Sequence, residues 1–264
     1  DNGNVGTLNI WNRAMPRQLT DKEMMRYCRQ ILLPSFDIDG QESLINGKAL
    51  IIGLGGLGCA ASQYLAAAGV GELTLVDFDT VDTTNLQRQI LHFEEDVNKA
   101  KAVSAAETLG RINSTIKINV LNKKLEDEEL SAVIKENDVV LDCTDNRETR
   151  QQINKLCFEH RTPLVSGAAI RFEGQVSTFS MSNEKGCYQC LSRHFGEQNL
   201  SCVESGILSP VVGVVGTLQA TETIKVLSGI GKTLESKLLI FDGLNSEFRT
   251  FALSPHPQCE ICGS

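Results

Sequence analysis

Short apolar runs alternate with longer amphipathic segments up to about residue 170. The apolar runs predict five strands, which are Ala49–Ile52, Leu73–Val76, Ile116–Leu121, Val139–Leu141 and Leu164–Val165. The amphipathic segments predict four helices, which are Cys59–Ala68, Lys99–Ile112, Leu125–Glu136 and Asn146–His160. Because strands alternate with helices of this length, we expect an α/β fold with a doubly wound, mostly parallel, Rossmann-like sheet. Thr20 and Glu23 form the pattern of a capping box, which predicts an additional helix before the first strand.

The second part of the chain follows a less regular pattern. Alternating positions predict antiparallel strands at Gln175–Ser180, Leu238–Phe241 and Phe248–Leu253. The apolar segment Val211–Leu227 predicts a buried helix. We expect residues 15–264 to form one domain, with an irregular C-terminal half, and residues 1–14 to be a disordered leader or a leftover from expression.

The composition is that of an acidic globular protein. Hydrophobic residues make up 41% and charged residues 22% of the 264 positions, which excludes disordered, collagen-like and coiled-coil classes. The formal net charge is −8, so no nucleic-acid partner is expected, because binding through a phosphate backbone needs a basic surface. The longest uncharged stretch, Ser205–Thr221, has 17 residues with polar ones among them, which predicts no membrane span. The start of the chain shows no secretory signal, so we expect a cytoplasmic protein.

A glycine-rich segment connects the first predicted strand to the helix after it. Gly53-Leu-Gly-Gly-Leu-Gly58 fits the G-x-G-x-x-G pattern. The glycines allow the backbone to approach a phosphate closely, and the helix N-terminus attracts its charge. Asp77 ends the second strand, 19 residues beyond Gly58, where a carboxylate could hold ribose hydroxyls. The pattern alone predicts a nucleotide, NAD included; a glycine turn that serves packing is the other interpretation.

The residues after Asp77 favour a nucleoside triphosphate. Arg88 and Lys101 offer fixed positive charge for a departing phosphate group, and Asn85 could bind phosphate or ribose. Asp145 follows the fourth strand, at the edge where open α/β sheets bind ligands, and could hold Mg²⁺. Structural alternatives exist for these residues: Arg88 and Lys101 could form ordinary ion pairs in a solvated loop, and Asp145 could cap the next helix.

Four of the nine cysteines form two C-x-x-C pairs, Cys187/Cys190 and Cys259/Cys262. Two such pairs can offer four thiolates to one zinc ion in a closed, tetrahedral, structural site. The 68 residues between the pairs exceed zinc-finger spacing, so the metal would close a large loop. Redox-active pairs or chance spacing are the alternatives. For Cys202 we expect no required role as a nucleophile, because no His–Asp partner is evident near it.

Five segments together are more specific than the glycine pattern alone. They are Arg26-Tyr-Cys-Arg-Gln30, Gly53–Gly58, Asp77-Phe-Asp79, Asn85-Leu-Gln-Arg-Gln89 and Asp142-Cys-Thr-Asp-Asn146. This combination resembles the ThiF/MoeB/HesA family, the bacterial relatives of ubiquitin-activating (E1) enzymes. The resemblance extends from about Leu19 to Gly263. It implies an E1-like adenylation domain with a zinc-binding C-terminal half.

The resemblance implies an enzyme that adenylates the C-terminal glycine of a ubiquitin-like sulfur carrier ending in Gly-Gly. The carrier's carboxylate would attack the α-phosphate of ATP, giving an acyl-adenylate and pyrophosphate. Within the family, the segments Phe36–Glu42, Ala61–Leu65, Ser166–Gly174 and Cys190–Gly196 favour the branch that serves molybdenum cofactor biosynthesis. The carrier of that branch is the small subunit of molybdopterin synthase. No rhodanese-like segment follows the second cysteine pair, so a separate sulfur donor is expected.

The resemblance also implies roles for individual residues. The expected catalytic residues are Arg29, Arg88, Lys101 and Asp145. In relatives, the arginine that matches Arg29 reaches the triphosphate from the other subunit, which implies a homodimer. Mg²⁺ is assigned to Asp145, and zinc is assigned to Cys187, Cys190, Cys259 and Cys262. The expected ATP contacts are Gly56, Asp77, Asp79, Thr84, Asn85, Leu86, Gln87, Arg88, Lys101, Asp145 and Asn146.

Three alternatives stay open at the level of the sequence. The first is the same reaction on the thiamine sulfur carrier, since its activating enzymes share nearly every motif. The second is an NAD-dependent oxidoreductase, which the glycine pattern and Asp77 favour but which leaves Arg88, Lys101 and Asp145 without a role. The third is a non-catalytic scaffold that binds the carrier.

Overall fold

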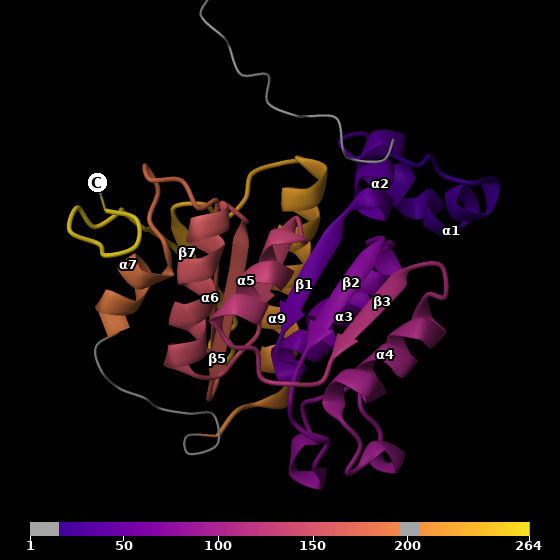
Figure 1. The fold of residues 1–264 in the computed structure, drawn as a ribbon, viewed down its shortest axis with the longest axis horizontal. Coiled ribbons are helices and arrows are strands. Elements are labelled where there is room, and N and C mark those ends of the chain that lie inside the picture. Colours follow the sequence, from indigo (N-terminus) through magenta and orange to yellow (C-terminus); the bar gives the residue numbers. More distant parts are fainter. Residues whose placement is uncertain (1–15, 196–205, 264) are drawn as a thin grey trace, which may run out of the picture.

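An eight-stranded mixed sheet forms the centre of the molecule (Figure 1). The structure, a computed structural model, describes residues 16–195 and 206–263, so the predicted leader 1–14 and Cys202 lie outside the described residues. In their order across the sheet, the strands are β3 (Lys117–Leu121), β2 (Glu72–Val76), β1 (Lys48–Ile52), β4 (Val139–Asp142), β5 (Leu164–Ile170), β6 (Glu173–Phe179), β7 (Lys237–Asp242) and β8 (Glu247–Ala252).

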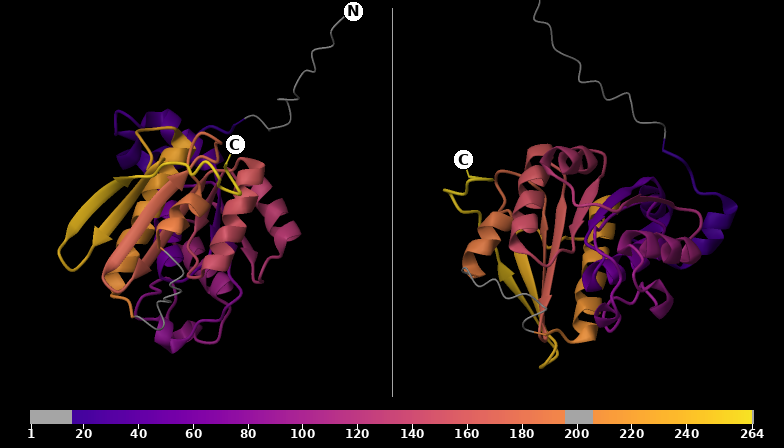
Figure 2. Two further views of the ribbon diagram at one scale, coloured as in Figure 1. Left: turned by 90° about the vertical axis from the view of Figure 1, so that its left-hand side faces the viewer. Right: turned by 60° about the horizontal axis from the view of Figure 1, so that its bottom comes forward.

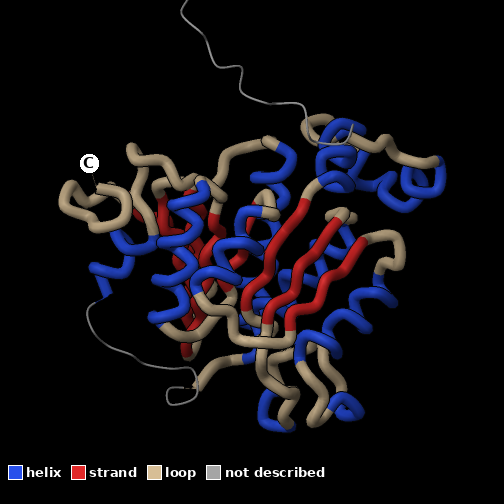
Figure 3. The backbone as a smooth tube through the Cα atoms, viewed as in Figure 1, coloured by secondary structure: helices blue, strands red, loops and turns tan. Residues whose placement is uncertain are grey.

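The strand directions confirm the predicted fold class. Strands β3, β2, β1, β4 and β5 are parallel neighbours, whereas β5 to β8 pair antiparallel. The chain starts in the middle of the sheet at β1, moves to one side through β2 and β3, and then moves to the other side through β4 and β5. This order makes the sheet doubly wound. The strands are the red segments of Figure 3, and the left view of Figure 2 shows the yellow β7–β8 hairpin at the outer edge.

Helices cover both faces of the sheet (Figure 1). They are α1 (Asp21–Ile31), α2 (Asp37–Asn46), α3 (Gly56–Ala68), α4 (Lys101–Ile112), α5 (Asp127–Lys135), α6 (Arg147–His160), α7 (Tyr188–Ser192) and α9 (Ser209–Ser228). Residues of α3, α4 and α9 join one apolar cluster, and residues of α5, α6 and α7 join another. The α/β pattern therefore places an apolar core on each side of the sheet.

Alternation along the central strand explains why both cores form. The side chain of Ile51 belongs to the cluster under α3, whereas Leu50 and Ile52 belong to the cluster under α6. Leu50 and Ile51 are fully buried. A strand that is buried on both faces reads as a continuous apolar run, which is why β1 was predictable from sequence.

The two helices before the sheet differ in how well the sequence predicted them. Helix α1 begins with the expected capping box, because Thr20 Oγ1 accepts from the Glu23 N–H at 3.3 Å and the Glu23 carboxylate accepts from the Thr20 N–H at 3.0 Å. Helix α2 was not predicted: its start has no side-chain cap, and Gly40 interrupts its sequence. Packing compensates, because Phe36, just before α2, is buried.

None of the helices in the described part of the chain has the length and apolarity that crossing a membrane requires.

Candidate nucleotide site and metal centre

The glycine-rich loop lies between β1 and α3, at the carboxyl edge of the parallel strands. Gly53 has φ +91°, and a Cβ at this residue would lie 2.8 Å from Cys143 O. A Cβ at Gly56 would lie 2.7 Å from Val212. Packing therefore requires these two glycines, whereas the nearest atom to a Cβ at Gly55 would be 3.6 Å away. Gly55 is also the N-cap of α3 and leaves the first turn without a side-chain cap, which suits an anion.

Asp77 holds the glycine loop in place. Its carboxylate accepts from the Leu54 N–H at 2.7 Å and from the Asp79 N–H at 2.8 Å. Asp77 is 9% exposed, and burial raises its pKa, although the two backbone N–H groups oppose that shift. Because each carboxylate oxygen has two lone pairs, Asp77 keeps acceptor capacity beyond these two bonds.

Lys101, the first residue of α4, pairs with Asp79. Its Nζ lies 2.9 Å from Asp79 Oδ2, and its backbone N–H donates to Asp79 O at 2.9 Å. The lysine side chain is 8% exposed and the aspartate side chain is 52% exposed. The positive charge of Lys101 also lowers the pKa of Asp77, which is otherwise raised by burial. Three residues predicted for the nucleotide, Asp77, Asp79 and Lys101, thus lie together.

The segment after Asp82 forms a 3-10 turn, η1 (Thr83–Asn85), that places Arg88 near Thr84. Arg88 Nη1 donates to Thr84 O at 3.2 Å, and the described residues offer it no ion pair. The Asn85 amide contacts Thr84 Oγ1 at 3.5 Å. Leu86 is half-buried and Gln87 is exposed. Lys101 therefore does form an ion pair, but at the buried start of α4 rather than in a solvated loop, and Arg88 forms none among the described residues.

Gln89 is a residue that sequence reasoning left without a role. It is 4% exposed, and its Oε1 is buried without a hydrogen-bond partner among the described residues. Its Nε2 is the nearest atom to the position that a Cβ at Gly55 would take. An orphaned amide oxygen beside the open part of the glycine loop fits a site that receives a polar ligand. Nothing in the sequence distinguishes this glutamine from Gln87, which is exposed.

The loop after β4 meets the glycine loop, as the contact between Cys143 and Gly53 shows. Asp142 is fully buried and accepts from Thr144 N–H at 3.0 Å and from Ser166 Oγ at 3.1 Å. Asp145 is exposed and accepts no hydrogen bond from the described residues, although its charge acts on the guanidinium of Arg150. The alternative of Asp145 as a helix cap was wrong.

Asn146 caps α6 instead, because its Oδ1 accepts from the Thr149 N–H at 2.9 Å. Asp145 is therefore left with an open carboxylate at the carboxyl edge of the sheet. Such a carboxylate fits Mg²⁺, which is bound through one or two carboxylates together with phosphate oxygens and water. The same bond gives Asn146, predicted as an ATP contact, a structural role of its own.

Arg29 is the predicted catalytic residue that the fold does not bring to this site. It lies in the last turn of α1 and is exposed. Helices α1 and α2 precede the amino end of β1, whereas the glycine loop follows its carboxyl end (Figure 1). Within one chain, Arg29 and the glycine loop therefore lie at opposite ends of β1.

The four paired cysteines come together as the sequence predicted. Their sulfur atoms all lie within 4.8 Å of one another, with Cys187 Sγ 3.7 Å from Cys259 Sγ and Cys190 Sγ 3.4 Å from Cys262 Sγ. Four Zn–S bonds of about 2.3 Å in a tetrahedron place the sulfurs about 3.8 Å apart. The donor set and its spacing thus fit a zinc ion.

Helix α6 and the C-terminal segment support this cluster. Asn154 Nδ2 lies 3.6 Å from Cys187 Sγ, and Asn154 Oδ1 accepts from the Tyr188 N–H at 2.9 Å. The His256 N–H donates to Cys190 Sγ at 3.3 Å. In Figure 1 the C-terminal segment lies beside α7, as expected if a metal ties the two together.

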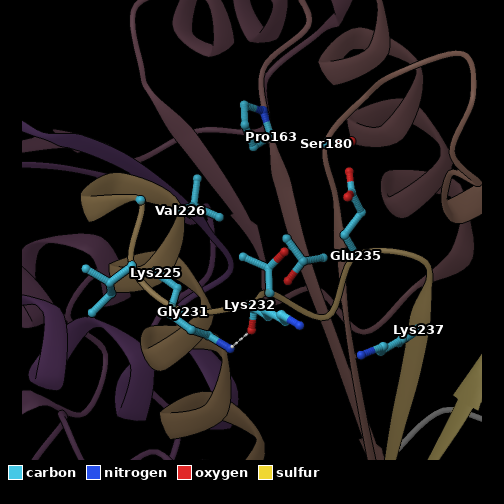
Figure 4. A pocket seen from close by; sticks show the side chains of 12 residues that line it. Pro163, Ser180, Lys225, Val226, Gly231, Lys232, Glu235 and Lys237 are labelled. Carbon is cyan, nitrogen blue, oxygen red and sulfur yellow. Dashed lines mark hydrogen bonds between the residues drawn. The ribbon is translucent and has the colours of Figure 1, made fainter. Parts of the chain in front are cut away.

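A separate cavity of about 490 Å³ lies between the end of α9 and strands β6 and β7 (Figure 4). Lys225 Nζ closes one side of it by donating to Lys232 O at 2.9 Å. None of the residues predicted for the nucleotide or the metal lines this cavity. The candidate nucleotide site is instead the open carboxyl edge of the sheet.

The doubly wound sheet, the glycine loop at its carboxyl edge and the four-cysteine cluster define an α/β protein of the E1-like type. The chain belongs to the ThiF family, whose sequence profile matches residues 27–261. This finding confirms the resemblance inferred from the motifs.

Named relatives match nearly the whole chain. The chain is 54% identical over 246 residues to a molybdopterin-synthase adenylyltransferase of Escherichia coli (strain K12), covering 93% of this chain and 99% of that protein. It is 46% identical to the sulfur carrier protein ThiS adenylyltransferase of the same strain, covering 93% of this chain and 97% of that protein. The oxidoreductase alternative finds no support among these relatives.

Solved structures share the fold. E. coli MccB with ATP superposes with a TM-score of 0.80 at 25% identity, covering 90% of this chain and 73% of that one. PaaA, at 21% identity and a TM-score of 0.77, covers 93% of this chain and 78% of that one and supports the fold alone.

Proposed function

We propose that this protein adenylates the C-terminal glycine of a ubiquitin-like sulfur carrier, the small subunit of molybdopterin synthase, for molybdenum cofactor biosynthesis. The observation that carries the proposal is the 54% identity to a molybdopterin-synthase adenylyltransferase along 99% of that protein's length. In the reaction, a carboxylate oxygen of the carrier attacks the α-phosphorus of ATP. The bond from that phosphorus to the bridging oxygen breaks, and pyrophosphate leaves.

This chemistry needs positioning and charge stabilisation rather than a protein nucleophile. The first turn of α3 offers uncapped backbone N–H groups to phosphate, and Asp77 offers its remaining lone pairs to the ribose. Arg88 and Lys101 oppose the negative charge that develops on the departing pyrophosphate. Asn85 contributes a further polar contact to the nucleotide.

Asp145 would hold Mg²⁺, because its exposed carboxylate accepts no hydrogen bond from the described residues. When bound, the ion neutralises charge on the phosphate oxygens. The four cysteines would hold zinc in a closed structural site, and such a site has no open position for catalysis.

Arg29 would complete the site of a second subunit in a homodimer. Its exposed position at the far end of β1 supports this assignment, since within its own chain it lies away from the glycine loop. The adenylate would then pass to a separate sulfur donor, which would convert it to a thiocarboxylate.

ATP–pyrophosphate exchange tests the proposal. The purified protein is assayed with the small subunit of molybdopterin synthase and, separately, with the thiamine sulfur carrier. Exchange with the first carrier alone is the expected result. Absence of exchange with both carriers would overturn the proposed activity.

The thiamine carrier is the second candidate substrate. The observation that favours it is the 46% identity to a ThiS adenylyltransferase over 97% of that protein. Exchange with the thiamine carrier alone would keep the chemistry and change the pathway.

A further inference from the structure

His92 is a buried side chain that joins the glycine loop to helix α4. It is 4% exposed, and its Nε2 lies 3.2 Å from Leu54 O, in the middle of the glycine loop. Its Nδ1 lies 2.8 Å from Ser104 Oγ, one turn after Lys101 on α4. Neither His92 nor Ser104 was assigned a role from the sequence, because a single histidine in a loop carries no pattern.

The bonds around His92 close a ring through the candidate nucleotide site. Leu54 accepts from His92 at its carbonyl and donates from its N–H to Asp77 at 2.7 Å. Asp77 accepts from the Asp79 N–H, and Asp79 pairs with Lys101. The backbone of α4 connects Lys101 to Ser104, and the hydrogen bond between Ser104 and His92 completes the ring.

The partners fix the tautomer of the ring. A backbone carbonyl can only accept, so the bond to Leu54 requires a proton on Nε2. The neutral ring then accepts at Nδ1 from the Ser104 hydroxyl. The carboxylate of Asp96 also faces Ser104, and the single hydroxyl proton of Ser104 serves Nδ1 in this arrangement. Burial lowers the pKa of His92, which keeps the ring neutral near pH 7.

We propose that His92 is a positioning residue that sets the glycine loop and the Lys101 helix at one fixed separation, so that both meet the triphosphate together. This inference rests on the proposed function, in which the site binds ATP. The tautomer and binding tests below require nucleotide binding alone and no adenylation of a carrier. The residue acts through its two hydrogen bonds, to Leu54 in the glycine loop and to Ser104 on α4.

The tautomer of His92 can be measured without an enzyme assay. Long-range ¹H–¹⁵N spectra of the full-length protein distinguish a protonated from an unprotonated imidazole nitrogen. The chain has four histidines, and the His92 signals are those missing from the H92Q variant. We expect a protonated Nε2 and an unprotonated Nδ1 at pH 7. A ring protonated at Nδ1 would overturn the proposal.

Two substitutions separate the two bonds. In H92Q the longer amide can place its nitrogen near the former Nε2 and keep the bond to Leu54 O, whereas H92N reaches only toward Ser104. Binding of a non-hydrolysable ATP analogue is measured by calorimetry. We expect H92N to bind about 3- to 10-fold more weakly, the range of one net hydrogen bond, and H92Q to stay within about twofold of the unaltered protein.

His160 supplies a matched control, because its Nε2 also bonds to a serine, Ser131 Oγ at 2.6 Å, but on α5 and α6. H160Q is expected to leave analogue binding unchanged. The proposal would be overturned if H92Q and H92N weakened analogue binding equally and lowered the melting temperature to a matching extent. His92 would then contribute to packing alone.

The KM values separate this inference from the proposed function. H92N should raise the KM for ATP and leave the KM for the carrier unchanged. If the unaltered protein binds the analogue but shows no exchange with either carrier, the proposed function fails while the binding and spectral tests of His92 still decide the inference.

Discussion

The ammonium group of Lys101 donates a hydrogen bond to Asp79 Oδ2 at 2.9 Å, and the backbone N–H of Lys101 donates to the carbonyl oxygen of Asp79 at 2.9 Å. The pair is unequal, because the lysine side chain is 8% exposed and the aspartate side chain is 52% exposed. Asp79 therefore fixes the start of α4 and holds the ammonium in position before any ligand arrives. A cation held in advance stabilises developing charge without a cost of reorganisation.

Replacing Lys101 with alanine should reduce ATP–pyrophosphate exchange by about 100-fold or more, the effect of losing one preorganised charge-stabilising donor. Lys99 is the matched control, since it lies two residues earlier and pairs with the buried Asp96 and the exposed Glu107 rather than with Asp79. K99A should retain nearly full exchange. Equal losses in K101A and K99A would contradict the role given to Lys101.

Asp145 and Asn146 are adjacent but should affect different properties. D145N should lower exchange by about 100-fold and raise the Mg²⁺ concentration that exchange requires, with little change in melting temperature. N146A should cost about 1 kcal/mol of stability, because it removes the cap of α6. Exchange at several Mg²⁺ concentrations and thermal unfolding measure the two effects. A D145N variant that loses stability and keeps its Mg²⁺ dependence would contradict this assignment.

The four-cysteine cluster should bind one zinc ion per chain, as measured by elemental analysis of protein purified without chelators. C259S should lose most of this zinc and lower the melting temperature, because the metal would tie the C-terminal segment to α7. C28S is the control, since Cys28 is exposed and lies on α1. Protein that contains no zinc before any substitution would rule out the assignment.

Mixing two inactive variants tests whether Arg29 acts across a dimer. R29A and K101A subunits should each be inactive alone, and mixing should restore up to one intact site of two in each heterodimer. The measurement is exchange activity after subunits are mixed and allowed to reassemble.

The control for this experiment is K22A, because Lys22 is an exposed residue on the same helix as Arg29. K22A homodimers should be active without mixing. Failure of R29A and K101A to rescue one another, in a mixture that sedimentation shows to be dimeric, would count against a shared site.

The sequence predicted the sheet well because its central strands are buried on both faces. The apolar run Ala49–Ile52 became β1, and the run at Val139 became β4 with Asp142 added at its end. Helix α2 was missed because packing of Phe36, rather than a capping pattern, supports it. The cap of α6 was misplaced by one residue, since Asp145 and Asn146 have equal preference for that position.

The sequence predicted those site residues that belong to a motif with a characteristic spacing, and it did not predict the others. The cysteine pairs were assigned correctly to one cluster, because two C-x-x-C pairs have few other uses in a reduced protein. Gln89 and His92 were left out, because their importance comes from burial beside the glycine loop. A loop glutamine and a loop histidine carry no periodicity from which burial could be inferred.

By itself, the sequence determined the α/β order of elements, the glycine loop and the two C-x-x-C pairs, because each of these depends on residues that are close together along the chain. Only the tertiary structure decided which distant side chains meet. It paired Lys101 with Asp79, closed the ring through His92, and left Arg29 at the other end of β1. The physical reason is that hydrogen bonds and burial depend on separations of a few ångströms, which the path of the whole chain through the sheet establishes.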